Sequence, residues 1–166
     1  MQFDTLIEVI NLNKKTYIIA VFILIVDQLS KSLIEVYFKL HESFCVIKDF
    51  FCVTVAHNTG GAWSIFNNYS YIFIIFSILA LGILIRFMFS FKNNLRNNIA
   101  FACTCGGILS NLADRLFLGY VRDFLDFKIL GYDYPIFNIA DIAIVLGVFL
   151  LIIAIFKGED KRENNK

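Results

Sequence analysis

Charged residues are scarce in this chain of 166 residues, at 17%, whereas 58% of its residues are hydrophobic. Soluble domains usually contain about a quarter charged residues and about half apolar ones. A soluble domain of this length would have too little polar surface to cover its apolar residues, so we expect the excess to face lipid. Because the net charge is only +1 and no basic stripe is present, nothing indicates nucleic acid as a partner.

Several common patterns of hydrolytic enzymes are also missing. The two histidines, His41 and His57, are not part of an H-E-x-x-H motif, which argues against a zinc protease, and no G-x-S-x-G occurs. Ser30 and Lys31 are adjacent, and adjacent helix residues do not face each other, which disfavours a Ser-Lys dyad. His57 is interpreted as an exposed strand residue. The sequence therefore predicts neither a metal nor a cofactor.

The four cysteines show no C-x-x-C or zinc-type spacing. Cys103 and Cys105 lie within an apolar run and are interpreted as small core residues. Cys45 and Cys52 lie in a polar, strand-like segment, and they could pair if that segment is outside the cytoplasm. Connectivity cannot be read from sequence, so this pairing stays open.

Four apolar runs are each close to the roughly 20 residues that a helix needs to cross a bilayer. Backbone polar groups in lipid must be satisfied within the segment, which favours helices over isolated strands. The pattern predicts an all-α integral membrane protein that forms a single membrane domain over residues 1–166. Its four transmembrane helices are expected at about 17–38, 69–91, 99–118 and 137–156.

The distribution of Lys and Arg predicts how these helices are oriented. Nine of the fifteen basic residues fall in residues 1–16, 86–96 and 157–166, and basic residues favour the cytoplasmic side. We therefore expect both termini, including the charged tail 157–166, in the cytoplasm. The polar sequence 27–31, in the second half of the first apolar run, stands where a signal peptide would have a small-residue cleavage site, so this helix is expected to be retained.

Between the first two helices, residues 44–57 are rich in β-branched and aromatic residues. Such a composition favours strands, with Lys48 and Asp49 as the turn between them. This stretch is too short and too polar to span a membrane. We expect a small β-structure at about 42–66, lying on the outer surface of the membrane.

Most intramembrane polar residues cluster at the outer ends of the helices, and polar groups in lipid are functional candidates. Asp27 and Lys31 share a helix face, although a local ion pair alone would explain them. Gly107, Asn111 and Arg115 share another face, which could be a structural polar seam or a binding surface. Asp114 flanks that face and is expected to pack in another direction.

Two further carboxylates lie at the same depth, Asp123 after the third helix and Asp141 at the start of the fourth. A capping box formed by Asn138 and Asp141 would explain Asp141 alone, but it does not explain Asp123. Two carboxylates that lie close together cannot both ionise cheaply and therefore share a proton. One can then act as a base on water while the other protonates a carbonyl oxygen. That chemistry hydrolyses a peptide bond.

Five sequence blocks resemble the lipoprotein signal peptidase family (signal peptidase II), and they occur in similar order and spacing. They are Asp27-Gln28-Leu29-Ser30-Lys31, Asn58-Thr59-Gly60-Gly61-Ala62, Gly106-Gly107 through Asn111-x-x-Asp114-Arg115, Val121-x-Asp123-Phe124, and Phe137-Asn138-x-Ala140-Asp141. One such block would be a weak signal, whereas five in order are specific. The departures are small: Gly61 stands where alanine is common, and Trp63 where phenylalanine is usual.

The resemblance implies an aspartyl endopeptidase of the inner membrane with four helices and a β-cradle on its outer face. Such enzymes cleave prolipoproteins just before a cysteine that already carries diacylglycerol, so the implied partners are these substrates and membrane lipids. Asp123 and Asp141 match the catalytic dyad. The other implied positions are Asn58, Gly60, Asn111, Arg115 and Asn138 around the substrate, and Asp27, Lys31, Asp114 and Ala140 in support.

Two other classes remain as alternatives, a proton-coupled transporter and a structural membrane subunit. A transporter would need carboxylates that continue through the helices, but the polar residues gather at one level and the second helix is nearly free of them. A structural subunit would not need two aspartates, an arginine and several asparagines at one depth. The peptidase interpretation accounts for both features.

Overall fold

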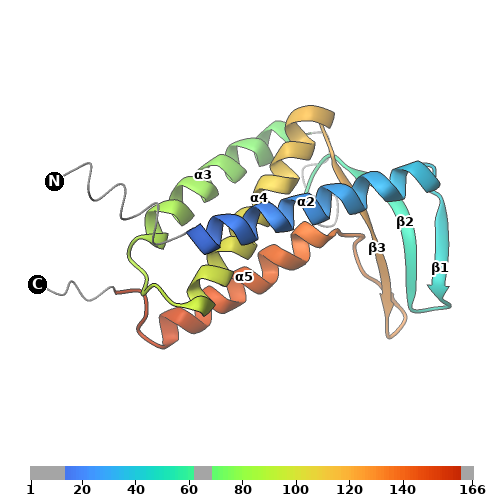
Figure 1. Cartoon of the computed structure of the whole chain (residues 1–166). Helices are drawn as coiled ribbons and strands as arrows, with labels where there is room; N and C mark the ends of the chain where they lie inside the picture. Colours follow the sequence, from blue (N-terminus) through green and yellow to red (C-terminus); the bar gives the residue numbers. More distant parts are fainter. Residues whose placement is uncertain (1–13, 62–68, 162–166) are drawn as a thin grey trace, which may run out of the picture.

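The computed structural model describes residues 14–61 and 69–161. These residues form four helices and a four-stranded antiparallel sheet (Figure 1). The helices are α2 (Lys14–Tyr37), α3 (Ser70–Met88), α4 (Leu95–Leu118) and α5 (Ile139–Phe156). The strands are β1 (Ser43–Ile47), β2 (Phe51–Asn58), β3 (Val121–Ile129) and β4 (Tyr132–Asp133). The predicted four-helix membrane fold with a small β-structure is confirmed.

Helix α4 packs against α2, α3 and α5 and is the central helix of the bundle. The helix expected to begin at Ile99 begins at Leu95, with Asn94 as its N-cap. By length and composition, α2, α3 and α5 are long and apolar enough to cross a membrane, whereas α4 does not meet this criterion. Its neighbours cover it, so it can carry buried polar side chains, namely Asn97, Thr104, Ser110, Asn111 and Asp114.

Adjacent glycines allow α4 to approach two neighbouring helices closely. A Cβ atom at Gly106 would lie 2.7 Å from the carbonyl oxygen of Ala20 on α2. A Cβ atom at Gly107 would collide with the carbonyl oxygen of Ala140 on α5. The absence of a side chain therefore brings α2 against α4 at Gly106 and the start of α5 against α4 at Gly107.

The sheet lies at the end of the bundle where α2 and α4 end (Figure 1). Strands β1 and β2 form the expected hairpin around residues 48–50, where Asp49 has a positive φ of 59°. Cys45 and Cys52 are directly paired in this hairpin and form a disulfide, which the sequence had left open. The expected β-segment reached residue 66, and its residues 62–66, including Trp63, lie outside the described part of the chain.

Strand β3 was not predicted, although the segment that carries Asp123 was expected beyond the third helix. It pairs with β2 so that Ala56 lies opposite Asp123 and Asn58 lies opposite Val121. The short strand β4 then pairs with the far end of β3. This pairing holds Asp123 within a sheet rather than in a loose connection.

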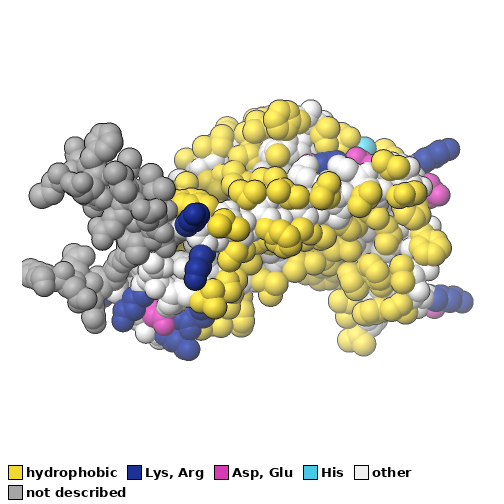
Figure 2. Space-filling view, in the orientation of Figure 1, with side chains coloured by type: hydrophobic (Ala, Val, Ile, Leu, Met, Phe, Trp, Pro, Cys, Tyr) yellow, Lys and Arg dark blue, Asp and Glu magenta, His cyan; other side chains and the backbone are white. Residues whose placement is uncertain are grey.

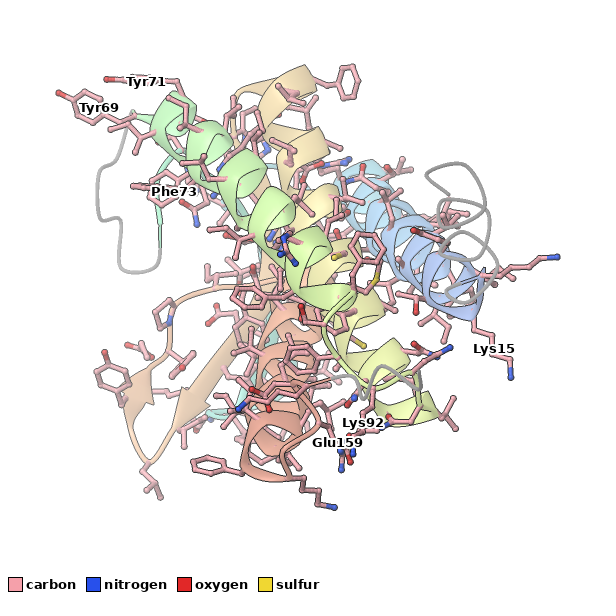
Figure 3. All side chains as sticks on the ribbon, turned by 90° about the vertical axis from the view of Figure 1, so that its left-hand side faces the viewer. Lys15, Tyr69, Tyr71, Phe73, Lys92 and Glu159 are labelled. Carbon is pink, nitrogen blue, oxygen red and sulfur yellow. A yellow bond between two sulfur atoms is a disulfide. The ribbon has the colours of Figure 1, made fainter. Side chains whose placement is uncertain are left out.

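Large hydrophobic side chains are exposed along the outer faces of the helices, including Phe22, Ile75 and Phe149. Figure 2 shows such side chains covering the middle of one face, with most charged side chains toward its two ends. A surface of this kind is suited to a lipid environment, as expected from the composition. Lys15 and Lys92 lie toward one end of the molecule, and Tyr69 and Tyr71 lie at the other end of α3 (Figure 3).

Candidate active site

Asp123 and Asp141 line the same cavity at the end of the bundle that carries the sheet. Asp123 comes from β3 and Asp141 from the first turn of α5. The cavity has a volume of about 490 Å³. Its other lining residues are Asn58, Gly61, Asn111, Arg115, Val121, Tyr134, Pro135, Ile136, Phe137, Ile142, Ile144, Val145 and Leu146.

The carboxylate of Asp123 is buried, with 3% of the residue exposed, and accepts a hydrogen bond at each oxygen. Asn58 Nδ2 donates to Oδ2 at 3.0 Å, and Asn138 Nδ2 donates to Oδ1 at 2.6 Å. Burial, reinforced by the negative charge of Asp141, raises the pKa of Asp123 to about 7, and the two amide hydrogen bonds oppose this shift. Asp123 can therefore hold a proton near neutral pH.

Asp141 has two structural partners. It forms a capping box with Asn138: the backbone N–H of Asp141 donates to Asn138 Oδ1 at 3.0 Å, and that of Asn138 donates to Asp141 Oδ2 at 3.1 Å. The other oxygen, Oδ1, accepts a hydrogen bond of 2.8 Å from Asn111 Nδ2. The capping interpretation is thus correct, but it does not exhaust the role of this side chain, which also lines the cavity.

Asn138 connects the two carboxylates. Its side-chain amide donates to Asp123 through Nδ2, while its backbone N–H donates to Asp141. Asn138 is fully buried and its Nδ2 also lies 3.2 Å from Asn111 Oδ1. This single residue fixes both aspartates against the start of α5.

The supporting residues lie behind this pair. Lys31 Nζ, which is fully buried, lies 2.6 Å from Asp27 Oδ2 and 3.1 Å from Asp114 Oδ2, and it donates to Asn111 Oδ1 at 2.8 Å. Asp27 in turn accepts a hydrogen bond of 2.8 Å from the backbone N–H of Ala140. The pair formed by Asp27 and Lys31 is therefore not only local, since it connects α2 to both α4 and α5.

Asp114 turns away from Arg115, as expected for adjacent helix residues, but its contacts are polar. Besides Lys31, its carboxylate accepts hydrogen bonds from Arg122 Nη2 at 2.7 Å and Gln28 Nε2 at 2.9 Å. Arg115 faces the cavity instead. Its Nη2 donates to the carbonyl oxygen of Gly60 at 3.1 Å, and its guanidinium carbon lies 5.1 Å from the centre of the Phe73 ring.

Three contributors to this site were missed or misread in the sequence. Gln28 and Arg122 were not assigned any role, and the interpretation of His57 as an exposed residue was wrong. His57 is partly buried, hydrogen-bonded to Glu35 at 2.8 Å and stacked on Tyr120 with ring centres 3.8 Å apart. One available signal was the spacing of polar residues at 28, 32 and 35, which places them on one face of an apolar helix.

The arrangement supplies acid and base chemistry at a boundary between polar and apolar surroundings. Two neighbouring carboxylates in a buried site can hold a single proton between them. Within residues 14–61 and 69–161, no three His, Cys, Asp or Glu side chains are grouped so that they could hold a metal ion. The cavity is apolar along α5, at Ile142, Val145 and Leu146, and is therefore suited to an apolar substrate segment beside the carboxylates.

Comparison with known proteins identifies relatives over most of the chain. A family model described as Signal peptidase (SPase) II matches residues 19–157. A lipoprotein signal peptidase from Staphylococcus aureus is 38% identical over 150 residues, which cover 90% of this chain and 92% of that protein. The lipoprotein signal peptidase of Staphylococcus aureus strain Newman has the same identity and coverage.

Solved structures agree with this result. A bacterial membrane enzyme determined by the in meso method at 2.3 Å resolution is similar, with a TM-score of 0.79, 39% sequence identity, and coverage of 91% of this chain and 93% of that chain. A second, determined at 1.9 Å resolution, has a TM-score of 0.77 and 40% identity over 86% of this chain and 92% of that chain. The sequence resemblance is therefore confirmed: this chain belongs to the signal peptidase II family and is an aspartic peptidase of the bacterial membrane.

Proposed function

We propose that Asp123 and Asp141 are the catalytic dyad of this peptidase. At neutral pH the ionised member removes a proton from water, whose oxygen attacks the carbonyl carbon, while the protonated member donates to the carbonyl oxygen. The tetrahedral intermediate then collapses, the C–N bond breaks and the leaving amine takes a proton from the dyad. The observation that carries this proposal is that both carboxylates line one cavity and share Asn138 as a partner.

The substrate in this proposal is a prolipoprotein, cut just before a cysteine that carries diacylglycerol. The name of the Staphylococcus aureus relative, lipoprotein signal peptidase, supports the substrate class. The apolar wall of the cavity supports the lipid: Val145 and Leu146 line the cavity and are also exposed on the outer surface of α5. An acyl chain or an apolar signal helix could therefore reach the carboxylates from the bilayer without crossing water.

The direct test is to incubate the purified protein with a diacylglyceryl-modified prolipoprotein and to measure product masses. We expect release of the signal peptide by a single cut before the modified cysteine. The same prolipoprotein without diacylglycerol is the matched control and should stay intact. Equal cleavage of both would contradict the lipid requirement, and cleavage of neither would contradict the proposed function.

We further propose that the substrate backbone is held by Asn58, Gly60, Asn111, Arg115 and Asn138. Arg115 has a donor to offer, because its buried Nε has no hydrogen-bond partner among the described residues. Its neighbour Gly60 is itself fixed, since the Gly60 N–H donates to Asn58 Oδ1 at 2.9 Å. A substrate carbonyl that accepts from Arg115 would lie beside Asn58, which contacts the Asp123 carboxylate.

Arg115→Ala is expected to accumulate normally but to lose about 2 kcal/mol of transition-state stabilisation, roughly thirtyfold in kcat/KM, as for one hydrogen bond to a charged group. Arg115→Lys should also be impaired, because an ammonium group does not reproduce the planar donor fork. Both are measured with the lipid-modified prolipoprotein. Near-normal processing by both variants would show that Arg115 is only structural.

We propose that both termini lie in the cytoplasm and that the active site lies near the outer face of the cytoplasmic membrane. Lys15 lies at the start of α2 and Lys92 just before the start of α4, whereas the sheet and the cavity lie where these two helices end, and this separation supports the orientation. The test uses a background in which the free cysteines Cys103 and Cys105 are replaced by alanine. Leu130 is fully exposed in the turn after β3. Leu130→Cys should react with a membrane-impermeant maleimide in intact cells. Lys92→Cys should react only after permeabilisation. Labelling of both from the same side would contradict the arrangement.

A further inference from the structure

Arg122 immediately precedes Asp123 on β3, and the side chains of consecutive strand residues point to opposite faces. Asp123 therefore faces the cavity with Asn58 and Asn138, whereas Arg122 faces α2 and α4. Although it is an arginine, Arg122 is only 9% exposed. Burying a guanidinium is costly unless its donors are satisfied, so its partners indicate what it does.

Four side chains from two helices accept from this one guanidinium or pair with it. Nη2 donates to Asp114 Oδ1 at 2.7 Å and to Gln28 Oε1 at 2.6 Å. Nη1 donates to Ser32 Oγ at 3.2 Å and lies 3.5 Å from Glu35 Oε2. Three of these partners, at positions 28, 32 and 35, occupy one face of α2 over two turns.

The backbone of Arg122 is held as well. Its N–H donates to Asp114 Oδ2 at 3.1 Å, and its carbonyl oxygen lies 3.4 Å from Asn138 Nδ2, the group that also donates to Asp123. His57 contacts the same face of α2, because it hydrogen-bonds to Glu35, and it lies opposite Arg122 in the β2–β3 pairing. The residue before Asp123 is therefore fixed through its side chain, its N–H and its carbonyl.

We propose that Arg122 is a positioning residue: it fixes β3 against α2 and α4 and thereby holds the Asp123 carboxylate in the cavity beside Asp141. This proposal rests on the proposed catalytic role of Asp123. A planar guanidinium with several fixed partners restricts the orientation of β3 as well as its distance from α2 and α4, which suits this role. Displacement of a reacting group by about 1 Å can cost on the order of a hundredfold in rate.

The simpler alternative is that Arg122 only neutralises the buried Asp114. Asp114 has a second cation within reach, however, since Lys31 Nζ lies 3.1 Å from its Oδ2. Gln28 also donates to it at 2.9 Å. Loss of the guanidinium would therefore leave Asp114 still paired, and Arg122→Met should fold. If Arg122 only neutralises charge, Arg122→Lys should keep full activity. If Arg122 positions Asp123, Arg122→Lys should be impaired.

The test compares Arg122→Met and Arg122→Lys with a matched control, Lys128→Met, on the same strand. Lys128 is exposed, its ion pair is with the exposed Asp133, and neither residue lines the cavity. For full-length protein acting on lipid-modified prolipoprotein, we expect kcat of Arg122→Met to fall by about ten- to a hundredfold, with KM within about twofold. Arg122→Lys should be intermediate, and Lys128→Met should be unchanged.

The pH profile separates positioning from a loss of folded protein. If Asp123 moves away from Asp141 and toward water, both causes that raise its pKa weaken, so the alkaline limit of Arg122→Met should move to lower pH. A loss of folded enzyme scales the rate equally at all pH values. Wild-type kcat in Arg122→Met, full activity of Arg122→Lys, or a reduced rate with an unmoved profile would each overturn the proposal. Asp123→Asn serves as a reference, because turnover by that variant would contradict the proposed function itself.

Discussion

Asp123→Asn and Asp141→Asn should each abolish cleavage of a lipid-modified prolipoprotein while each protein accumulates normally in the membrane. Asparagine has nearly the size of aspartate and still offers a hydrogen-bonding oxygen, but it cannot take a proton from water. Loss of either carboxylate removes one of the two protonation states on which the reaction depends. The measurement is product mass over time, with membrane levels determined for each variant.

The double variant distinguishes a functional pair from two separate contributions. Residues that act as one unit are not additive, so Asp123→Asn with Asp141→Asn should be no slower than the slower single variant. If Asp141 were only part of the capping box, Asp141→Asn should cost about 1 kcal/mol of stability or less and leave processing intact. Retained turnover in either single variant would falsify the dyad assignment.

A matched control is available on the same strand. Asp126 also lies on β3, but its carboxylate accepts a hydrogen bond of 2.7 Å from Thr54 Oγ1 on β2 and does not line the cavity. Asp126→Asn keeps the change in chemistry while leaving both proposed catalytic groups in place. Its turnover should stay close to that of the unaltered enzyme.

The same pair should produce a bell-shaped dependence of rate on pH. In the proposed mechanism, activity needs one proton on the dyad, so it should fall at low pH, when both carboxyls are protonated, and at high pH, when neither is. Since burial and Asp141 raise the pKa of Asp123 to about 7, the alkaline decline should begin near neutral pH rather than near pH 4. Both limits belong to the pair and not to one residue.

The helices and the cluster of polar residues could be predicted from the sequence because lipid imposes strong constraints. A spanning helix needs a long apolar run, and a polar side chain in such a run needs a partner or a function. Asp27, Lys31 and Asn111 were therefore visible as candidates. The local pair of Asp27 and Lys31 was visible too, but the contact of Lys31 with Asn111 was not, since these two residues lie 80 positions apart in sequence on different helices.

Strand β3 escaped prediction because it lacks the usual alternation of apolar and polar residues. Arg122 and Asp123 are both charged and both buried, one against α2 and α4 and the other in the cavity. Neither face of this part of the strand is a simple apolar face, so the period-two pattern is absent. The disulfide between Cys45 and Cys52 was hidden for a related reason, since it depends on the register of the hairpin.

The second large effect is expected at Lys31, whose loss should destabilise the whole bundle. Its ammonium group is fully buried between Asp27 and Asp114. Lys31→Met fills similar space but leaves two buried carboxylates without this cation, and breaking a buried ion pair in this way costs about 3–5 kcal/mol. We expect low accumulation in the membrane and a clearly lower unfolding temperature in detergent. Lys39→Met, at an exposed lysine beyond the end of α2, is the control and should be neutral.

A double variant separates the stabilising role of Lys31 from its effect on the site. Asp27→Asn with Lys31→Met removes one buried charge together with its partner, so part of the stability should return. Activity should stay low even in that variant. Lys31 donates to Asn111 Oδ1, and this contact leaves Asn111 Nδ2 to donate to Asp141. Without the cation, the amide of Asn111 can turn, and the hydrogen bond that orients Asp141 is lost. A double variant that recovers both its unfolding temperature and its full turnover would show that Lys31 acts on stability alone.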